Sequence, residues 1–276
     1  MVREPVAEGF YPGDARILKL MLDRLFKDTE NTVDRKVIGL IAPHAGYLYS
    51  GKTAAKAYAQ IEKEYDAVIL LGPDHTGMAK TVSISTEPWR TPLGEIEIDK
   101  TLAEKIIEKS DIIIKDNDAH TYEHSIEVQL PFLQHQLKNL KIVPIIIPHT
   151  DIGLKKLQDI ADTISKATEG KKVLFIASSD LTHFGKGYNF VPVEKDELEW
   201  IKNTDNTIMQ KITELDEIQT LNRTRETTVC GSIPIAILIM IMKNKNIDKG
   251  AIIDYATSYD VSKNKDAIVG YGGIVF

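Results

Sequence analysis

The sequence alternates short runs of apolar, mostly β-branched residues with longer runs whose apolar residues recur every three or four positions. The apolar runs are typical of buried strands and occupy residues 36–42, 67–72, 81–85, 141–148, 172–178 and 251–257, with one or two closing strands in 267–276. The amphipathic runs have helix spacing and occupy 13–29, 50–65, 101–110, 154–168 and 194–212. Near-continuous apolar strands indicate a sheet that is covered on both faces. We therefore predict an α/β fold, with a mostly parallel or mixed central sheet and helices on both faces.

Length and charge narrow the class of protein further. The 276 residues contain no repeat and no linker-like stretch, so we predict a single domain over 1–276. The net charge of −6, with Lys and Arg scattered along the chain, argues against nucleic acid as a partner. The longest apolar stretch has about 11 residues and is too short to span a bilayer, so we predict no membrane partner. The single cysteine and the absence of a secretory signal favour the cytoplasm.

Histidines follow the predicted strands more often than expected for ordinary loops. His44, His75, His149 and His183, four of the seven histidines, each come within a few residues of a predicted strand's carboxyl end. Ligands of α/β sheets bind beyond these ends. A single loop histidine is ordinarily hydrogen-bonded to backbone, and we interpret His149 in this way, while His135, in a polar stretch, is predicted to be exposed. The four together predict a site at one edge of the sheet.

The residue types of this site favour metal chemistry. Neutral imidazole is the commonest metal ligand, and two or three imidazoles beside a carboxylate or thiolate suit Zn, Fe or Cu. His44 and His75 form the best pair because both follow short strand-terminal turns of the same form. Asp180 and His183 lie three residues apart in one predicted loop. They are candidates either for an orienting carboxylate with its general base or for completing the metal shell. We predict no nucleotide cofactor.

A second motif competes with this interpretation. Residues 120–124 read His-Thr-Tyr-Glu-His, the pattern of inverted zinc peptidases, in which His120 and His124 would share a helix face and Glu123 would act as base. Pro131 interrupts the stretch that follows, which disfavours a long active-site helix. His124 and Glu127 are three residues apart and are also predicted to face the pocket at the sheet edge.

Cys230 is the only cysteine of the chain and directly precedes an apolar run that is typical of a buried helix. A lone free cysteine is most often a small buried residue in a protein core. Its residue type alone therefore leaves open whether Cys230 fills space or binds a metal ion.

Six segments, spread in order along the chain, together resemble a known family. They are REPVAEGFYPGD, IAPHAGYLYSGKTAAKAY, LGPDHTG, EHSIEVQLPFLQ, SSDLTHFG and CGSIPIAIL. This set resembles the Memo family, which is similar in fold to the class III extradiol dioxygenases, non-haem iron enzymes that open catechol rings. The resemblance implies His44, His75 and Cys230 as metal-site positions and His183 as the acid/base histidine, with Asp180 in the same motif.

The resemblance also contains one departure from the dioxygenases. Their third iron ligand is a glutamate, whereas the corresponding position here is Cys230. A thiolate is softer and more easily oxidised, which shifts the preference toward Cu(I), Zn or a redox-sensitive iron. Glu226, four residues earlier, is an alternative carboxylate ligand if the helix begins early.

Two functions follow from this resemblance, beside the peptidase. The first is metal-dependent redox or oxygenase-like chemistry on a small molecule or a peptide. The second is a non-catalytic peptide-binding or adaptor module that uses the former active-site cleft, since eukaryotic relatives resemble signalling adaptors. Tyr47, Tyr49, Phe184 and Tyr188 would supply its aromatic surface. Prokaryotic members are similar to proteins encoded beside radical-SAM proteins, which implies a shared pathway.

Overall fold

Four parallel strands form the centre of the sheet. In the computed structural model, which describes residues 1–150 and 152–276, these strands are adjacent in the order β1 (Gly39–Ala42), β8 (Val173–Ser178), β2 (Ala67–Pro73) and β7 (Lys141–Ile147). Every residue of β1, β2 and β8 is buried. This explains why these strands read as continuous apolar runs, because helices cover both of their faces.

Shorter and antiparallel strands complete the sheet. On one side β11 (Ile268–Val275) runs antiparallel to β1, and β10 (Ala251–Thr257) follows it. On the other side β3 (Ser83–Ile84) is antiparallel to β7 and parallel to β6 (Ile114–Lys115). The remaining strands are β4 (Trp89–Thr91), β5 (Gly94–Ile98), which pairs with β4 and β7, and β9 (His183–Phe184), which pairs with β11. The sheet is therefore mixed, as predicted, although β4, β5, β6 and β9 were not predicted.

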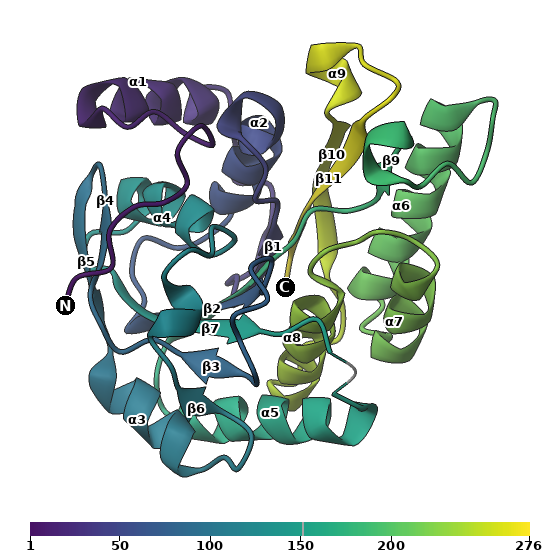
Figure 1. Ribbon diagram of the computed structural model, residues 1–276. Helices are drawn as coiled ribbons and strands as arrows, with labels where there is room; N and C mark the ends of the chain where they lie inside the picture. Colours follow the sequence, from purple (N-terminus) through teal and green to yellow (C-terminus); the bar gives the residue numbers. More distant parts are fainter. Residues whose placement is uncertain (151) are drawn as a thin grey trace.

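Helices cover both faces of the sheet (Figure 1). One group is α1 (Ala15–Phe26), α2 (Tyr47–Tyr58) and α4 (Leu130–Gln136), and another is α3 (Lys100–Glu108), α5 (Leu154–Ala167), α7 (Glu217–Arg225) and α8 (Ser232–Asn244). The others are α6 (Glu197–Thr213) and the short α9 (Tyr259–Ser262) between β10 and β11. Strand β11 is so tightly enclosed that a Cβ atom at Gly273 would touch Ala57 of α2, and one at Gly272 would touch Met209 of α6.

Among the described helices, α8 has the longest unbroken run of buried residues. All of its residues from 234 to 242 are buried, and it packs against α5, α7 and the central strands. The apolar run after Cys230 thus forms the predicted buried helix. Within residues 1–150 and 152–276, no helix combines the length and the apolar character needed to cross a bilayer.

Candidate metal centre

Three neighbouring strands deliver three polar side chains to the same edge of the sheet. His44, His75 and Asp180 each lie two residues beyond the end of a strand, namely β1, β2 and β8. Because these strands are parallel and adjacent, their carboxyl ends meet at one edge, and the residues that follow them must lie close together.

Cys230 reaches this edge from the start of α8. The N–H of Gly231 donates to the Ser179 hydroxyl at 2.9 Å. A Cβ atom at Gly231 would lie 2.5 Å from the Ser179 Cβ and 2.6 Å from the Ser178 carbonyl oxygen, so only glycine permits this approach. As a result, the Cys230 sulfur lies 3.2 Å from the backbone nitrogen of Asp180.

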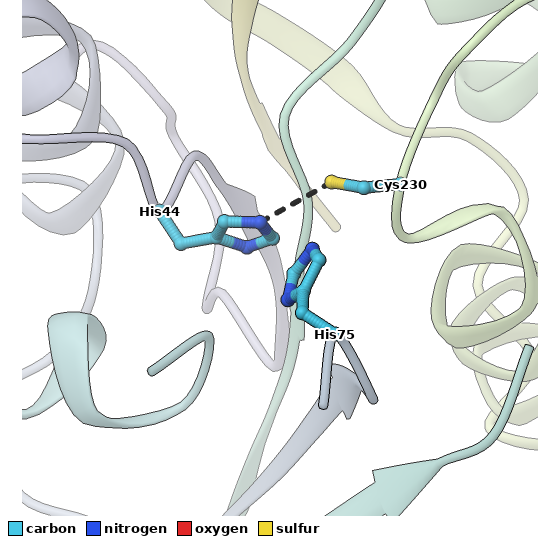
Figure 2. Close-up of side chains that lie close together, drawn as sticks. All are labelled: His44, His75 and Cys230. Atoms are coloured by element: carbon cyan, nitrogen blue, oxygen red, sulfur yellow. Dashed lines mark hydrogen bonds between the residues drawn. The ribbon is translucent and has the colours of Figure 1, made fainter. Parts of the chain in front are cut away.

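His44, His75 and Cys230 form a group that we call the donor trio (Figure 2). Each offers one ligand atom, and these atoms lie within 4.8 Å of one another. The Cys230 Sγ is 3.2 Å from Nε2 of His44, and the two imidazole centroids are 5.1 Å apart. Two imidazoles and a thiolate suit zinc, iron or copper. The residues present can therefore hold a transition metal.

The tautomer of His44 follows from its hydrogen bonds. Its Nδ1 lies 2.9 Å from the Ser178 hydroxyl, and that hydroxyl donates its own hydrogen to the Ser125 carbonyl at 2.7 Å. The Gln129 amide also donates to Ser178, at 2.8 Å. Ser178 therefore accepts from His44, so Nδ1 carries the proton and the lone pair of Nε2 points toward Cys230.

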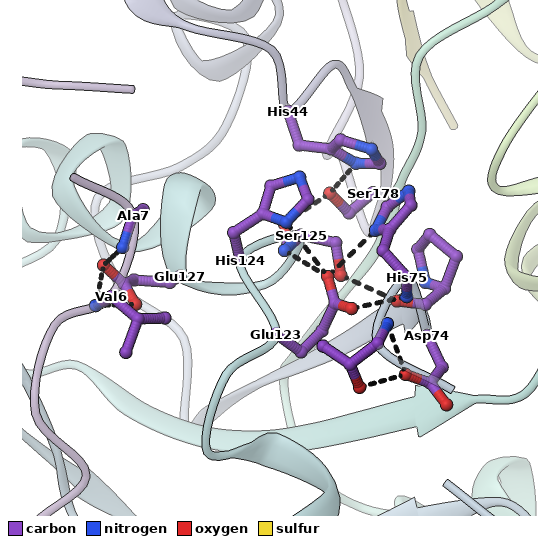
Figure 3. Close-up of polar contacts among 12 residues, drawn as sticks. Val6, Ala7, His44, Asp74, His75, Glu123, His124, Ser125, Glu127 and Ser178 are labelled. Atoms are coloured by element: carbon purple, nitrogen blue, oxygen red, sulfur yellow. Dashed lines mark hydrogen bonds and ion pairs between the residues drawn. The ribbon is translucent and has the colours of Figure 1, made fainter. Parts of the chain in front are cut away.

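His75 is fixed in the same tautomer by Glu123 (Figure 3). The Glu123 carboxylate accepts from His75 Nδ1 at 3.0 Å, from the His75 backbone N–H at 2.5 Å and from the Ser125 N–H at 2.8 Å. Burial raises the carboxyl pKa, but the hydrogen bonds and charges of His75, Ser125 and His124 outweigh it and bring the pKa of Glu123 to about 2. An ionised carboxylate only accepts hydrogen bonds, so Nδ1 of His75 carries the proton and Nε2 is left for a metal.

The electrostatics of the site favour the neutral forms of His44 and Cys230. Burial, reinforced by the neighbouring imidazoles of His75 and His124, lowers the pKa of His44 well below its usual value. Burial and the Asp180 carboxylate raise the pKa of the Cys230 thiol. A neutral imidazole is ready to bind a metal, whereas the thiol must first lose its proton, so metal binding here releases a proton.

His183 presents a third free imidazole nitrogen. Its Nδ1 lies 3.1 Å from the carbonyl oxygens of both Leu181 and Thr228, which only accept hydrogen bonds. The proton therefore resides on Nδ1, and Nε2 is available as a proton acceptor. The backbone N–H of His183 donates to the Thr228 hydroxyl at 2.7 Å, which fixes the position of the residue.

Asp180 holds the turn of His44 rather than the ring of His183. Its carboxylate accepts from the backbone N–H groups of His44, at 2.8 Å, and Ala45, at 3.3 Å. Burial raises its pKa, against the effect of His183 and these two N–H groups. In the described part of the chain no hydrogen bond joins Asp180 to His183, so the predicted orienting role is corrected: backbone carbonyls orient His183 instead.

Two members of the donor trio, His44 and His75, line a cavity of about 470 Å³. Its polar lining includes His44, His75, His124, Asp180 and His183, and its aromatic lining includes Phe10, Tyr49, Tyr188 and Tyr271. His124 therefore faces the pocket, as the sequence predicts. Such a volume, with a few polar groups converging among aromatic rings, is typical of small-molecule sites.

Three side chains predicted near the pocket lie elsewhere. Tyr47 is buried, and its hydroxyl donates to the Val128 carbonyl at 2.7 Å. Glu127 is buried and forms an ion pair with Arg3. Phe184 belongs to a separate apolar cluster beside α6. None of these three side chains lines the cavity, because buried partners already engage them.

The peptidase arrangement does not form. Residues 118–120 are a single 3₁₀ turn and 121–126 are irregular, so His120 and His124 share no helix face. His120 is fully buried, with Nε2 3.2 Å from the Ser83 carbonyl, and burial lowers its pKa to about 3. A second group of possible ligands contains His75, Glu123 and His124, but not His120.

Three further predictions concern residues around the centre. Glu226 is exposed beyond the end of α7, 3.9 Å from Arg223, and belongs to neither ligand group, so it does not replace Cys230. His149 also belongs to neither group, although its ring lies 5.9 Å from that of His75. His135 is only partly exposed, because it stacks on Phe26.

The residues that orient the imidazoles were missed in the sequence. Ser178 is the last residue of β8 and is fully buried. In the sequence, a serine at the end of an apolar strand and directly before the Ser-Asp motif was a usable signal. Glu123 was noticed only as a peptidase base, and Gln129 gave no signal at all. Phe10 lies in the N-terminal GFYPGD segment, far in sequence from the histidines it approaches.

Comparison with known proteins decides the family. A family model described as Memo-like protein matches residues 3–275. The chain belongs to the Memo family. A MEMO1 family protein of Thermococcus kodakarensis is 39% identical over 292 residues, covering 100% of this chain and 99% of that protein. Another, from Methanosarcina acetivorans, is 38% identical over 281 residues, covering 99% and 98%. The resemblance seen in the sequence is thus confirmed.

The fold of this Memo-family chain also has a distant match among solved structures. A crystal structure of an uncharacterized protein from Escherichia coli has a TM-score of 0.57 and 10% sequence identity, covering 86% of this chain and 99% of that one. At such low identity the match supports the α/β fold alone.

Proposed function

We propose that this Memo-family chain is a metal-dependent protein with redox or oxygenase-like activity, in which the donor trio binds iron or copper, with zinc as a further ion that fits. The observation that carries the proposal is the shared tautomer of His44 and His75. Both rings have their Nδ1 engaged by an acceptor, so both Nε2 atoms are left for a metal beside the single thiol. His44 and His75 line a cavity, which leaves room for an exogenous ligand beside the three donors.

In this proposal, each residue around the metal has a distinct role. A bound ion would supply Lewis acidity and, if it is iron or copper, electron transfer. His183 accepts a proton at Nε2 from a molecule in the cavity and later returns it. Asp180 keeps the His44 turn in place through two backbone N–H groups. The rings of Tyr49 and Tyr188 line the cavity, and this aromatic surface favours a small aromatic molecule or a single aromatic side chain as the ligand.

Metal analysis tests this proposal directly. Purified protein is reconstituted anaerobically with Fe²⁺, Cu⁺ or Zn²⁺ in parallel, desalted and analysed for bound metal. We expect stoichiometric retention of at least one ion, loss in Cys230→Ser, and retention in the control His135→Gln, which removes an imidazole distant from the trio. Oxygen uptake by the iron-loaded protein, with a catechol as probe, then tests turnover. Wild-type protein that retains none of the three ions would refute the proposal.

A peptide-binding module is the second candidate. It is favoured by the aromatic surface of the cavity, where Phe10, Tyr49 and Tyr188 meet polar groups. Calorimetric titration of metal-free protein with tyrosine-containing peptides tests it. Binding that is unchanged by Cys230→Ser but lost in Tyr49→Ala would favour the binding module over the redox protein.

A further inference from the structure

One guanidinium near the N-terminus holds three points of the segment that supplies Glu123. Arg3 is 6% exposed. It donates from Nε to the His120 carbonyl at 3.1 Å, from Nη2 to the Glu123 carbonyl at 2.7 Å, and from Nη1 to the Glu127 carboxylate. The guanidinium also lies 4.4 Å from the centroid of the Trp89 ring. Its planar fork thus spans residues 120–127 at a fixed angle.

The segment that Arg3 holds has little regular structure of its own. Residues 121–126 form bends and turns between two 3₁₀ turns. Arg3, by contrast, is anchored by its main chain, since its N–H donates to the Pro88 carbonyl at 2.8 Å and its carbonyl accepts from Arg90 at 2.9 Å. A well-anchored side chain therefore sets the position of a segment that no helix sets.

Glu127 binds the N-terminal segment at several further points. Its carboxylate accepts from the backbone N–H groups of Val6 and Ala7 (Figure 3). It also accepts from the Tyr11 hydroxyl and from Arg3. We call Arg3, Tyr11, Glu127 and these two N–H groups the Glu127 clamp. Its carboxylate oxygens are all engaged within the protein, so it joins the N-terminal segment to the 120–127 segment and is not available to a ligand.

We propose that Arg3 is a positioning residue of the metal centre. It fixes the backbone of Glu123, whose carboxylate then holds the His75 ring with the proton on Nδ1 and Nε2 toward the donor trio. The chain of contacts runs from Arg3 to the Glu123 carbonyl, and from the Glu123 carboxylate to His75. This inference rests on the proposed function, since it concerns the affinity of the same centre for metal.

Three variants separate positioning from general stabilisation. Arg3→Met removes the charge and all three donated hydrogen bonds. Arg3→Lys keeps a positive charge for Glu127 but cannot reach both carbonyls. Arg90→Met is the matched control, because the Arg90 side chain forms ion pairs with Glu4 and Glu95 on the surface, in the strand beside Arg3. Folding of each variant is checked by circular dichroism and thermal denaturation.

The first readout is affinity for Co²⁺, titrated against a competing chelator. We expect about tenfold weaker binding in both Arg3→Met and Arg3→Lys, the lower end of the effect of losing an outer-sphere partner, and no change in Arg90→Met. A purely structural role would lower the melting temperature but leave the affinity of the folded protein unchanged. Should Arg3→Met not fold, Arg3→Lys decides, and wild-type affinity in that variant would overturn the proposal.

The second readout does not depend on metal. ¹⁵N NMR of the metal-free protein, with His75 signals assigned by their loss in His75→Gln, shows which ring nitrogen carries the proton. We expect Nδ1 in the wild type and Arg90→Met, and a mixture of both tautomers in the Arg3 variants. A wild-type protein that binds no metal would refute the proposed function, whereas an unchanged His75 tautomer in a folded Arg3 variant would refute the positioning role.

Discussion

The donor trio and the Glu127 clamp are both polar clusters, but only the side chains of the clamp are all buried, and the hydrogen bonds of the two clusters are organised in opposite ways. In the clamp, one carboxylate is surrounded by donors and is paired with one guanidinium. In the trio, the lone pairs of two imidazoles and one sulfur converge, with the proton-bearing Nδ1 atoms turned away. The first cluster is neutralised by the protein itself, and the second gathers acceptors around one point.

This difference shows how one polar cluster can stabilise the fold while another is suited to chemistry. A saturated cluster ties distant segments together, as the clamp ties the N-terminal residues to the 120–127 segment. A cluster of convergent acceptors is instead complementary to a cation. Glu123 belongs to both systems, since its carbonyl accepts from Arg3 and its carboxylate accepts from His75.

The largest expected effect comes from neutralising the clamp. In Glu127→Gln the buried guanidinium of Arg3 loses its counter-charge, and breaking a buried pair in this way costs about 3–5 kcal/mol. Urea denaturation should show this loss in the free energy of unfolding, while metal affinity of the folded protein falls by less than in the Arg3 variants, because both hydrogen bonds from Arg3 to backbone carbonyls remain. The control Glu4→Gln removes an exposed partner of Arg90 and should leave stability unchanged. Equal stability of Glu127→Gln and wild type would contradict the comparison.

The next effect is a pH dependence from Glu123. Its pKa in the folded protein is about 2, below the usual 4.5, so the ionised form stabilises the fold above pH 4.5 and this contribution is lost as the pH falls toward 2. The full contribution is about 3 kcal/mol at 1.4 kcal/mol per pKa unit. Denaturant titrations between pH 6 and pH 2 should show the difference between wild type and Glu123→Gln shrinking with acidity. A constant difference across that range would argue against an ionised Glu123.

Removing the Cys230 sulfur should lower metal affinity strongly and stability little, the reverse of the effects expected for Glu127→Gln. Cys230→Ala is expected to weaken metal binding at least about 100-fold, beyond the loss of an outer-sphere partner, because a ligand itself disappears. Stability of the metal-free protein should change little, since Cys230 is only partly buried. Chelator competition and thermal denaturation of the metal-free protein measure the two quantities. If stability fell as much as affinity, the trio would be a structural cluster like the clamp.

The smallest effect concerns the hydroxyl behind His44. Ser178→Ala removes the acceptor for Nδ1 and should weaken metal binding about tenfold. Ser83→Ala is the matched control, because Ser83 is equally buried and contacts His120, which lies outside the trio. Isothermal titration of both variants with Zn²⁺ makes the comparison, and equal affinities would show that Ser178 does not orient His44.

Much of this arrangement was predictable from sequence because it follows from strand order. Once the runs ending before His44, His75 and Asp180 are identified as parallel strands, the meeting of these residues requires only that the strands be neighbours, as β1, β8 and β2 are. The role of Cys230 was different. Its residue type left the question open, and the family resemblance supplied the expectation that it joins the two histidines.

The failures concern side chains whose partners lie far away in the sequence. Glu127 was predicted to face the pocket because its spacing from His124 fits one helix face. His124 instead lies outside the 3₁₀ turn that begins at Glu127, and Arg3, 124 residues away, binds the Glu127 carboxylate. Tyr47 and Phe184 were predicted to supply aromatic surface to the cleft, yet both are core residues. Local spacing predicts which residues share an element, and it contains no information on the distant partner that engages a side chain.

The hydrogen bonds of Arg3 couple the anchoring of the N-terminal segment to metal binding, and this coupling is reciprocal. If anchoring the N-terminal segment strengthens metal binding, the cycle of equilibria requires that metal binding strengthen the anchoring by the same factor. Amide hydrogens of Val6 and Ala7, which are bonded to Glu127, would then exchange more slowly with solvent once the ion is bound, although they contact no ligand atom. The first ten residues would thus act as a remote reporter of occupancy.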